Sequence, residues 1–276
     1  MRDDLNIGMI GAGNMGGAII RGIITAGYPK NKIMVNDIDK SKSDSLQRET
    51  GIKIAESIDE IISFSNLLIL AVKPDITIKI ASALKNYTGI IISVAAGISI
   101  NTIKASAGEN KKIVRAMPNA PVNVKAGMTV ISHTNNLSND EIDFIKSFFS
   151  TVGETLVMDE KFMNAVTAIS GSGPAYLFTF LQAMADGGVK LGIPRAESLL
   201  LASQTILGSI KIFLDKNESP ITLREKITSP GGTTIEALHV LEKAGFNGII
   251  IDAIEAAAKK SKELDNYANN ATNKSN

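Results

Sequence analysis

The chain has 276 residues, with 29 lysines and arginines against 28 aspartates and glutamates, and a formal net charge of +1 at pH 7. This balance argues against nucleic acid as the main partner, because nucleic-acid-binding proteins usually carry a basic excess or patch. The sequence contains no cysteine, which excludes disulfides, a thiolate nucleophile and cysteine-ligated metal sites. Since the only histidines are His133 and His239, a histidine metal site is not expected either, and both residues are assigned structural or solvent-exposed roles.

No uninterrupted apolar run reaches the roughly 18 residues that span a bilayer. The N-terminal segment carries two acidic residues and leads into a short strand, which is not the pattern of a signal peptide. The sequence therefore predicts a soluble, cytoplasmic protein without a membrane partner.

Strand-length apolar segments alternate with amphipathic helical segments over the first 159 residues. Such alternation predicts parallel βαβ units with helices on both faces of the sheet. Strands are expected at 5–10, 33–35, 67–72, 90–94, 112–115, 128–132 and 155–158. Helices are expected at 18–24, 76–87, 98–107 and 138–149.

The pattern changes after about Asp159, where strand-like segments stop and helical spacing dominates. Helices are expected at 175–189, 196–214, 235–244 and 248–264. We therefore predict an α/β Rossmann-like domain at 1–159, followed by an all-helical domain at 160–276. Residues 266–276 are polar and rich in asparagine, and are predicted to form a disordered tail.

Gly11, Gly13 and Gly16 lie between the first expected strand and the first expected helix. In a dinucleotide-binding fold the first glycine allows a tight turn, the second lets backbone approach a pyrophosphate, and the third permits close packing of helix on strand. Asn14 and Met15 begin the helix, whose unpaired N–H groups attract an anion. A glycine turn without a ligand is the alternative, but strand, spacing and helix together favour a dinucleotide.

The second strand ends near Asn36 and Asp37, about 20 residues beyond the glycine motif, where such folds bind the adenosine ribose. An acid here hydrogen-bonds the ribose 2′-hydroxyl and repels a 2′-phosphate, whereas Lys40 and Lys42 could favour the phosphate. Asp37 or Asp39 could equally cap the next helix. The predicted cofactor is therefore NADH or NADPH, with neither preferred.

Other candidates for cofactor binding follow later strands, at the sheet edge where open α/β folds bind ligands. Lys73 could face the ligand, or could be solvated beside a proline that merely begins a helix. Small residues after the next strand would let a flat ring lie against backbone, or simply allow close packing. These candidates are Ala71, Val72, Lys73, Pro74, Ala95, Gly97 and Asn119.

In the helical half, Ser229-Pro-Gly-Gly-Thr-Thr234 forms a turn that opens a helix. Thr233 and Glu236 have the spacing of a capping box, which predicts Thr233 as the N-cap. Free N–H groups at the helix start form an anion site, and Gly232 would let an anion approach the backbone.

Two segments, Ser-Gly-Ser-Gly-Pro-Ala-Tyr at 170–176 and Ser-Pro-Gly-Gly-Thr-Thr at 229–234, carry a specific resemblance. With the glycine motif, Ala-Val-Lys-Pro at 71–74, Ser-Val-Ala-Ala-Gly at 93–97 and Arg-Ala-Met-Pro-Asn at 115–119, the chain resembles pyrroline-5-carboxylate reductases over about residues 7–262. The resemblance implies NAD(P)H-dependent reduction of 1-pyrroline-5-carboxylate to L-proline, the last step of proline biosynthesis. It also implies a Rossmann domain followed by a helical dimerisation domain with interleaved subunits.

The resemblance assigns the substrate carboxylate to Ser229, Gly232, Thr233 and Thr234, and places Thr234 near the ring nitrogen as the candidate catalytic proton donor. It also places Asn119 near the cofactor and substrate. Little more is required of side chains, because a protonated imine is already electrophilic and the nicotinamide supplies the hydride. Solvent or the substrate's own proton could also serve as the acid.

Two other functions are weighed. β-Hydroxyacid dehydrogenases share a Rossmann start and a helical end, but they use a lysine that residues 164–174 lack. A catalytically silent nucleotide-binding protein would not need the 229–234 segment, which is intact. The segment Gly248–Ala258 is rich in isoleucine and alanine with few charges, so this helix either packs within its own subunit or forms a subunit interface. The family resemblance favours the interface, in a homodimer or a higher oligomer of dimers.

Overall fold

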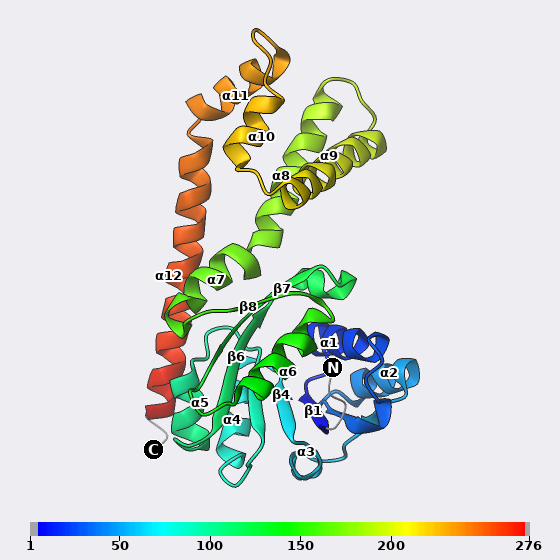
Figure 1. The fold of residues 1–276 in the computed structure, drawn as a ribbon, viewed down its shortest axis with the longest axis vertical. Helices are drawn as coiled ribbons and strands as arrows, with labels where there is room; N and C mark the ends of the chain where they lie inside the picture. Colours follow the sequence, from blue (N-terminus) through cyan, green and yellow to red (C-terminus); the bar gives the residue numbers. More distant parts are fainter. Residues whose placement is uncertain (1–4, 274–276) are drawn as a thin grey trace. The chain divides into compact units, whose positions relative to one another are not determined.

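The structure is a computed structural model that describes residues 5–273, with side chains described as far as Tyr267. The chain forms two compact units (Figure 1). Unit 1 combines the residues up to Ser172 with those from Ala256 onward, and unit 2 consists of Gly173–Glu255. Unit 1 is an α/β sandwich and unit 2 is helical, so the predicted fold class is confirmed.

Unit 1 is built on one sheet of eight strands within the described residues, in the order β3-β2-β1-β4-β5-β6-β7-β8. Neighbouring strands are parallel except β6 and β7, which are antiparallel. This order brings the carboxyl ends of β1, β2 and β4 to one edge of the sheet. The strands are β1 (Ile7–Ile10), β2 (Ile33–Asn36), β3 (Lys53–Ile54), β4 (Leu67–Leu70), β5 (Ile90–Ser93), β6 (Lys112–Pro118), β7 (Gly127–His133) and β8 (Gly153–Val157).

Helices cover both faces of this sheet, as the alternating pattern predicts (Figure 1). The principal helices and turns of unit 1 are α1 (Asn14–Thr25), α2 (Lys40–Thr50), α3 (Ile58–Phe64), α4 (Pro74–Ala83), α5 (Ile100–Ala107), the 3-10 helix η2 (Ala120–Val124), α6 (Asn139–Ser150), the 3-10 helix η3 (Glu160–Phe162), α7 (Met163–Val166) and the π-helix η4 (Thr167–Gly171).

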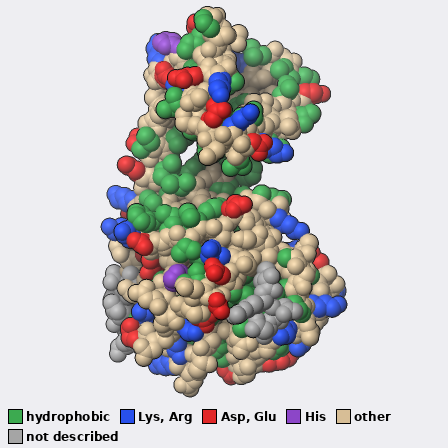
Figure 2. All heavy atoms as spheres, viewed as in Figure 1, with side chains coloured by type: hydrophobic (Ala, Val, Ile, Leu, Met, Phe, Trp, Pro, Cys, Tyr) green, Lys and Arg blue, Asp and Glu red, His purple; other side chains and the backbone are tan. Residues whose placement is uncertain are grey.

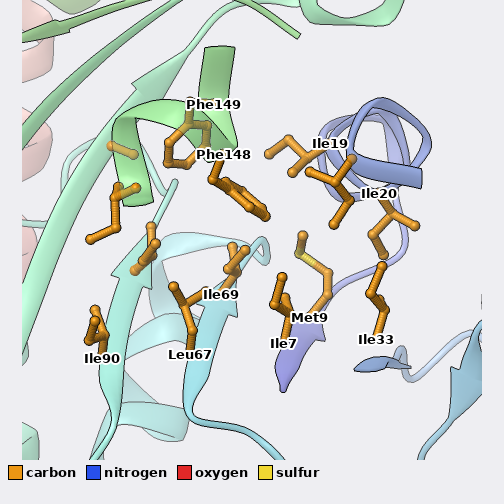
Figure 3. Close-up of a cluster of buried hydrophobic side chains, with 14 of the residues drawn as sticks. Ile7, Met9, Ile19, Ile20, Ile33, Leu67, Ile69, Ile90, Phe148 and Phe149 are labelled. Atoms are coloured by element: carbon orange, nitrogen blue, oxygen red, sulfur yellow. The ribbon is translucent and has the colours of Figure 1, made fainter. Parts of the chain in front are cut away.

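The core lies on the two sides of the central strands, because successive strand residues point to opposite faces. On one face, Ile7 and Met9 of β1 pack with α1 and α6; Figure 3 shows them near Ile19, Ile20 and Phe148. On the other face, strand residues pack with α3, α4 and α5 in a second buried cluster. A continuous core on both faces holds the carboxyl edge of the sheet, and the turns attached to it, in place.

The unit boundary differs from the predicted one after residue 159. Met163 and Val166 of α7 are buried with Val130 of β7, so the segment after β8 packs as part of unit 1. The last helix, α12 (Phe246–Asn273), contributes residues from Ala256 onward to unit 1 as well.

Three contacts attach the end of α12 to unit 1. Gly97 has a φ of 72°, and a Cβ built on it would lie 3.0 Å from the Leu264 Cβ. The Ser261 hydroxyl donates to Asn164 Oδ1 at 2.7 Å. The carboxylate of Asp265 pairs at 3.3 Å with the buried guanidinium of Arg115 on β6.

Arg115 has a second partner, Glu160, at 3.2 Å, and the same Glu160 oxygen accepts the backbone N–H of Ile100 at 2.7 Å. The Arg115 side chain is 4% exposed, so these carboxylates neutralise a charge that is almost withdrawn from water. Residues 266–273, which belong to the predicted disordered tail, continue α12 as a helix in the structure, and 274–276 lie outside the described residues.

Unit 2 consists of α8 (Gly173–Lys190), α9 (Arg195–Lys216), α10 (Pro220–Lys226), α11 (Thr233–Lys243) and the first turns of α12. The helices α8 and α9 meet closely at Gly188, where an added Cβ would lie 2.0 Å from the Ser198 hydroxyl. That hydroxyl donates to the Ala185 carbonyl at 2.7 Å. Arg224 of α10 and Glu242 of α11 form an exposed ion pair at 3.3 Å.

The helix α9 leaves much of its apolar surface uncovered, and Figure 2 shows hydrophobic side chains at the surface of unit 2. Among the described residues, α9 is the one helix that is long and apolar enough, by length and composition alone, to cross a membrane. No membrane-length apolar segment is predicted from the sequence, because polar residues interrupt every apolar run in α9. An exposed apolar helix of this length indicates a surface that another protein or a membrane covers.

Replacing Asp265 with alanine is expected to lower the free energy of unfolding by about 3 kcal/mol, because the buried Arg115 loses one of its two carboxylate partners. Urea unfolding followed by circular dichroism measures the change. The matched control on the same helix is Glu263→Ala, which breaks the exposed pair with Lys260 and should change stability by less than about 0.5 kcal/mol. Equal effects of the two variants would contradict a structural role for the Arg115 pair.

Candidate active site

The glycine motif turns sharply between β1 and α1, and its three glycines meet different surroundings. Gly11 has a φ of 107°, and an added Cβ would lie 2.3 Å from the Ala71 carbonyl oxygen. An added Cβ at Gly16 would lie 2.1 Å from the Gly11 carbonyl oxygen. At Gly13, by contrast, an added Cβ would meet no atom within 4 Å. Gly11 and Gly16 are therefore required by packing, whereas Gly13 leaves space above the backbone.

The start of α1 supplies unpaired donors at this open position. Gly13 is the N-cap and makes no side-chain capping hydrogen bond, and its carbonyl accepts the N–H of Gly17 at 2.8 Å. The N–H groups of Asn14, Met15 and Gly16 lie in the first turn, where an α-helix offers no internal acceptor. Those groups and the helix dipole make this turn an anion site. The Met15 side chain packs against the core, so only its backbone faces a ligand.

Asp37 is tied directly to the glycine turn. Its Oδ2 accepts the N–H of Ala12 at 2.7 Å, and its Oδ1 accepts the N–H of Asp39 at 2.9 Å. The neighbouring Asn36 carbonyl accepts the N–H of Gly11 at 2.8 Å. The helix cap is Asp39, whose side chain accepts the N–H of Ser41. Of the two cap candidates, the structure thus selects Asp39, and the hydrogen bond from the Ser41 hydroxyl lowers the pKa of the Asp39 carboxyl.

A groove of about 1350 Å³ runs from the glycine turn along the carboxyl edge of the sheet. Its lining includes Gly11, Gly13, Asn36 and Asp37, together with Ala71, Val72 and Lys73 after β4. Seven of the predicted cofactor-binding residues therefore come together in one groove of unit 1. Pro74 follows as the first residue of α4, with Lys73 at the N-cap. These features fit a nicotinamide dinucleotide: open space at Gly13, free N–H donors beside it, and an extended groove.

Ala95 and Gly97 differ from the other predicted cofactor residues. The Ala95 side chain is buried in the core with α4 and α5. Gly97 is buried beneath Leu264 of α12, and this close approach accounts for a glycine there. Neither residue lines the groove described above. These small residues were expected either to let a flat ring lie against backbone or to allow close packing, and the structure shows the close packing. A ligand contact through their backbone stays a prediction.

Asn119 connects the end of β6 to the π-helix η4. Its Oδ1 accepts the N–H of Met128 at 2.8 Å, and its Nδ2 donates to the Ser170 carbonyl at 3.2 Å. The Ser170 hydroxyl is buried without a hydrogen-bond partner among the described residues. Buried polar groups normally have partners, and π-helices are frequent at functional sites. Ser170, the first residue of the 170–176 segment that carries the family resemblance, is therefore a candidate ligand contact in addition to the predicted site residues.

The 229–234 segment of unit 2 is a tight turn followed by α11. The N–H of Gly232 donates to the Ser229 carbonyl at 3.1 Å, and Gly231 has a φ of 64°. The Ser229 hydroxyl lies so close to Gly232 that an added Cβ would approach it to 2.3 Å. No hydrogen-bond partner is seen within the described residues for the hydroxyls of Ser229, Thr233 or Thr234. They are available to a ligand together with the backbone.

The predicted capping box is wrong. Gly232 is the N-cap of α11, with extended φ and ψ of −81° and 170°, and no side chain caps the helix. Thr233 is therefore the first helical residue, and Glu236 lies one position beyond where a capping box requires it. The absence of a side-chain cap favours anion binding at the start of α11, because the N–H groups of the first turn stay free of side-chain acceptors.

The two histidines lie apart from both features. His133 ends β7, with its Nδ1 3.1 Å from the Thr134 carbonyl oxygen, and His239 is exposed in α11. In the part of the chain that the structure describes, no group of three or more histidines or carboxylates could hold a metal ion.

Comparison with known families gives two matches along the chain. A model of the pyrroline-5-carboxylate reductase dimerisation family matches residues 160–264. A model described as NADP oxidoreductase, coenzyme F420-dependent, matches residues 6–97, which contain the glycine turn and all the residues that line the groove.

Relatives match almost the whole chain. Pyrroline-5-carboxylate reductase of Escherichia coli is 38% identical over 262 residues, which cover 94% of this chain and 97% of the relative. The enzyme of that name from Arabidopsis thaliana is 37% identical over 266 residues, covering 95% and 96%. Among solved structures, a pyrroline-5-carboxylate reductase from Coxiella burnetii superposes with a TM-score of 0.89 at 33% identity, covering 94% of this chain and 98% of that one. Plasmodium falciparum pyrroline carboxylate reductase with NADP bound gives 0.87 at 31% identity, covering 96% and 100%.

Replacing Gly13 with valine is expected to weaken dinucleotide binding at least about tenfold, equivalent to about 1.4 kcal/mol. The side chain would occupy the space that backbone leaves open, while stability should change by about 1 kcal/mol or less because nothing is displaced. Isothermal titration calorimetry with NADH and NADPH measures the affinity.

The matched variant is Gly16→Ala, whose methyl group would strike the Gly11 carbonyl and should cost about 1–3 kcal/mol of stability. A folded Gly13→Val protein with unchanged affinity for both dinucleotides would show that the ligand does not approach this turn.

Proposed function

Because the chain belongs to the pyrroline-5-carboxylate reductase family, we propose that unit 1 holds the nicotinamide dinucleotide at the glycine turn and that the start of α11 holds the substrate. The reaction is the reduction of 1-pyrroline-5-carboxylate to L-proline with NAD(P)H, the last step of proline biosynthesis. The assignment of the dinucleotide site rests mainly on the open space at Gly13, which lies beside the free N–H groups of α1.

The substrate is a small cyclic imino acid whose carboxylate needs a partner. We assign that carboxylate to the first turn of α11, where the N–H groups of Thr233 and Thr234 are uncapped and the helix dipole favours an anion. Gly232 lets the carboxylate reach the backbone, and the Ser229 hydroxyl beside it adds a donor. Such a clamp fixes the ring in one orientation, which is the main contribution that positioning makes to the rate.

The chemistry requires a hydride on the imine carbon and a proton on the ring nitrogen. Bound NAD(P)H supplies the hydride. We assign the proton to the Thr234 hydroxyl, which is half-buried at the substrate clamp and has no hydrogen-bond partner among the described residues. When an unprotonated imine accepts the hydride, negative charge develops on the ring nitrogen, which then becomes a stronger base than the Thr234 alkoxide. The hydroxyl proton therefore moves to the nitrogen, and water returns a proton to Thr234.

The protein also associates with itself, since residues 160–264 match a dimerisation family. We propose that α9 forms part of the interface of a homodimer. Leu200, Leu207 and Leu214 recur every seven residues on one side of α9 and are 67%, 50% and 69% exposed. An apolar stripe with this spacing is typical of a helix that packs against another helix.

A second copy of the chain thus accounts for the length and apolar character of α9. A cytoplasmic location, and the expectation that neither nucleic acid nor membrane is a partner, stay predictions.

The test of the function is to incubate the purified chain with 1-pyrroline-5-carboxylate and NADH or NADPH, following loss of reduced nicotinamide and formation of L-proline by chiral chromatography. Thr234→Val should lower kcat by about tenfold or more, because the proton must then come from water, while the dissociation constants of NADH and NADPH stay unchanged.

The matched control is Thr205→Val, where the hydroxyl only donates to the Leu201 carbonyl within α9. Wild-type kcat in Thr234→Val would remove this residue from proton transfer. Oxidation of β-hydroxy acids with no proline formed would instead support the dehydrogenase alternative.

Replacing Leu207 with glutamate is expected to shift the protein toward monomer, because a charge would be buried in the α9 interface. Size-exclusion chromatography with light scattering measures the molar mass. The control is Ser209→Glu, two residues along the helix and so on its opposite side, which should keep the wild-type mass. An unchanged mass for Leu207→Glu would exclude this stripe as an interface.

A further inference from the structure

We propose that Asp37 makes NADH the preferred cofactor of this chain by excluding the 2′-phosphate of NADPH. The inference rests on the proposed function in one respect, that the dinucleotide binds in the groove of unit 1. It goes further because the family relationship leaves the choice between the two cofactors open, and one relative has been solved with NADP bound.

Asp37 lies where this fold binds the adenosine ribose of a dinucleotide. It directly follows β2, about 20 residues beyond the glycine motif, where an acid in this fold hydrogen-bonds the ribose hydroxyl that NADPH carries as a phosphate ester. Asp37 also lines the same groove as Gly13. The acid and the proposed pyrophosphate site therefore lie in a single cavity.

The Asp37 carboxylate cannot turn away from a ligand without breaking two hydrogen bonds. One is the 2.7 Å bond from Ala12 N–H, which ties it to the glycine turn itself, and the other is the 2.9 Å bond from Asp39 N–H. Each oxygen keeps a further lone pair that can accept a ribose hydroxyl. A 2′-phosphate would instead place its negative charge beside a carboxylate held in place.

The charge of the groove also disfavours a 2′-phosphate. Three lysines and four carboxylates line it, and no arginine does so among the described residues. Arginine is the side chain that best matches a phosphate, through its planar fork of donors. The charged lining residues are Lys40, Lys42, Lys73, Asp37, Asp44, Glu56 and Asp75.

The lysines nearest Asp37 in sequence are already paired with acids. Lys40 lies 3.4 Å from Glu56, and Lys42 lies 3.6 Å from Asp39. Both pairs are exposed and weak, so either lysine can leave its partner. Release of either lysine would not move Asp37, and release of Lys40 would leave the Glu56 carboxylate unpaired at the groove. The fixed acid therefore decides the preference.

The test compares dissociation constants of NADH and NADPH for the wild-type chain and for Asp37→Asn, measured by calorimetry without substrate. The wild type should bind NADH at least about tenfold more tightly, since like charges placed together at a binding site cost that much or more. Asp37→Asn keeps an oxygen to accept Ala12 N–H but removes the charge, so the ratio should move at least about tenfold toward NADPH.

The matched control is Asp59→Asn, which removes one carboxylate from the first turn of α3, outside the groove lining, and should leave the ratio unchanged. Competition by 5′-AMP and adenosine 2′,5′-bisphosphate on the wild type gives a second reading without any variant. The first should bind more tightly than the second.

Equal or tighter binding of NADPH by the wild type, or an unchanged ratio in a folded Asp37→Asn protein, would overturn the proposal. Because these are binding measurements, they are separate from the reductase assay. Proline formation with NADPH preferred would refute the role of Asp37 alone, whereas NADH preference without proline formation would refute the reaction alone.

Discussion

The site in unit 1 depends on one steric constraint, the close approach of the glycine turn to the end of β4. Gly11 lies so near the Ala71 carbonyl, and Gly16 so near the Gly11 carbonyl, that any side chain would force them apart. This contact sets the start of α1 at the carboxyl edge of the sheet, with its first N–H groups unpaired. Gly13, free of such contacts, is where a phosphate group can reach them. The anion site therefore follows from packing of backbone on backbone.

The tethered Asp37 completes this arrangement from the next strand. By accepting the Ala12 N–H it fixes the distance between the glycine turn and the end of β2. One carboxylate thus serves the architecture of the turn and, in our proposal, the choice of cofactor. A fixed acid selects more sharply than a mobile one, because a ligand cannot displace it cheaply.

Much of the fold could be predicted from the sequence, because buried parallel strands such as Leu67–Leu70 are continuous apolar runs and the glycine motif has fixed spacing. The helix α2 could not, since its sequence is almost entirely polar and only Ser43 and Leu46 are buried. The pairing of Arg115 with Asp265 joins positions 150 residues apart, which no local pattern reveals.

In the candidate site, too, local motifs could be recognised from the sequence whereas tertiary contacts could not. Local motifs correctly brought seven residues to one groove, and they located the turn before α11. Sequence spacing alone misplaced the N-cap, because Gly232 adopts the extended conformation and shifts Thr233 into the helix. The hydrogen bond from Ala12 to Asp37 depends on tertiary structure, as does the burial of the Ser170 hydroxyl, and neither can be read from the sequence even though Ser170 lies in a recognisable motif.

The most direct test of this account is a crystal structure of the chain with NADH bound. The account predicts pyrophosphate oxygens within hydrogen-bonding distance of the N–H groups of Asn14, Met15 or Gly16, above Gly13, and a ribose hydroxyl on the Asp37 carboxylate. A dinucleotide bound elsewhere, with its pyrophosphate away from the start of α1, would contradict it.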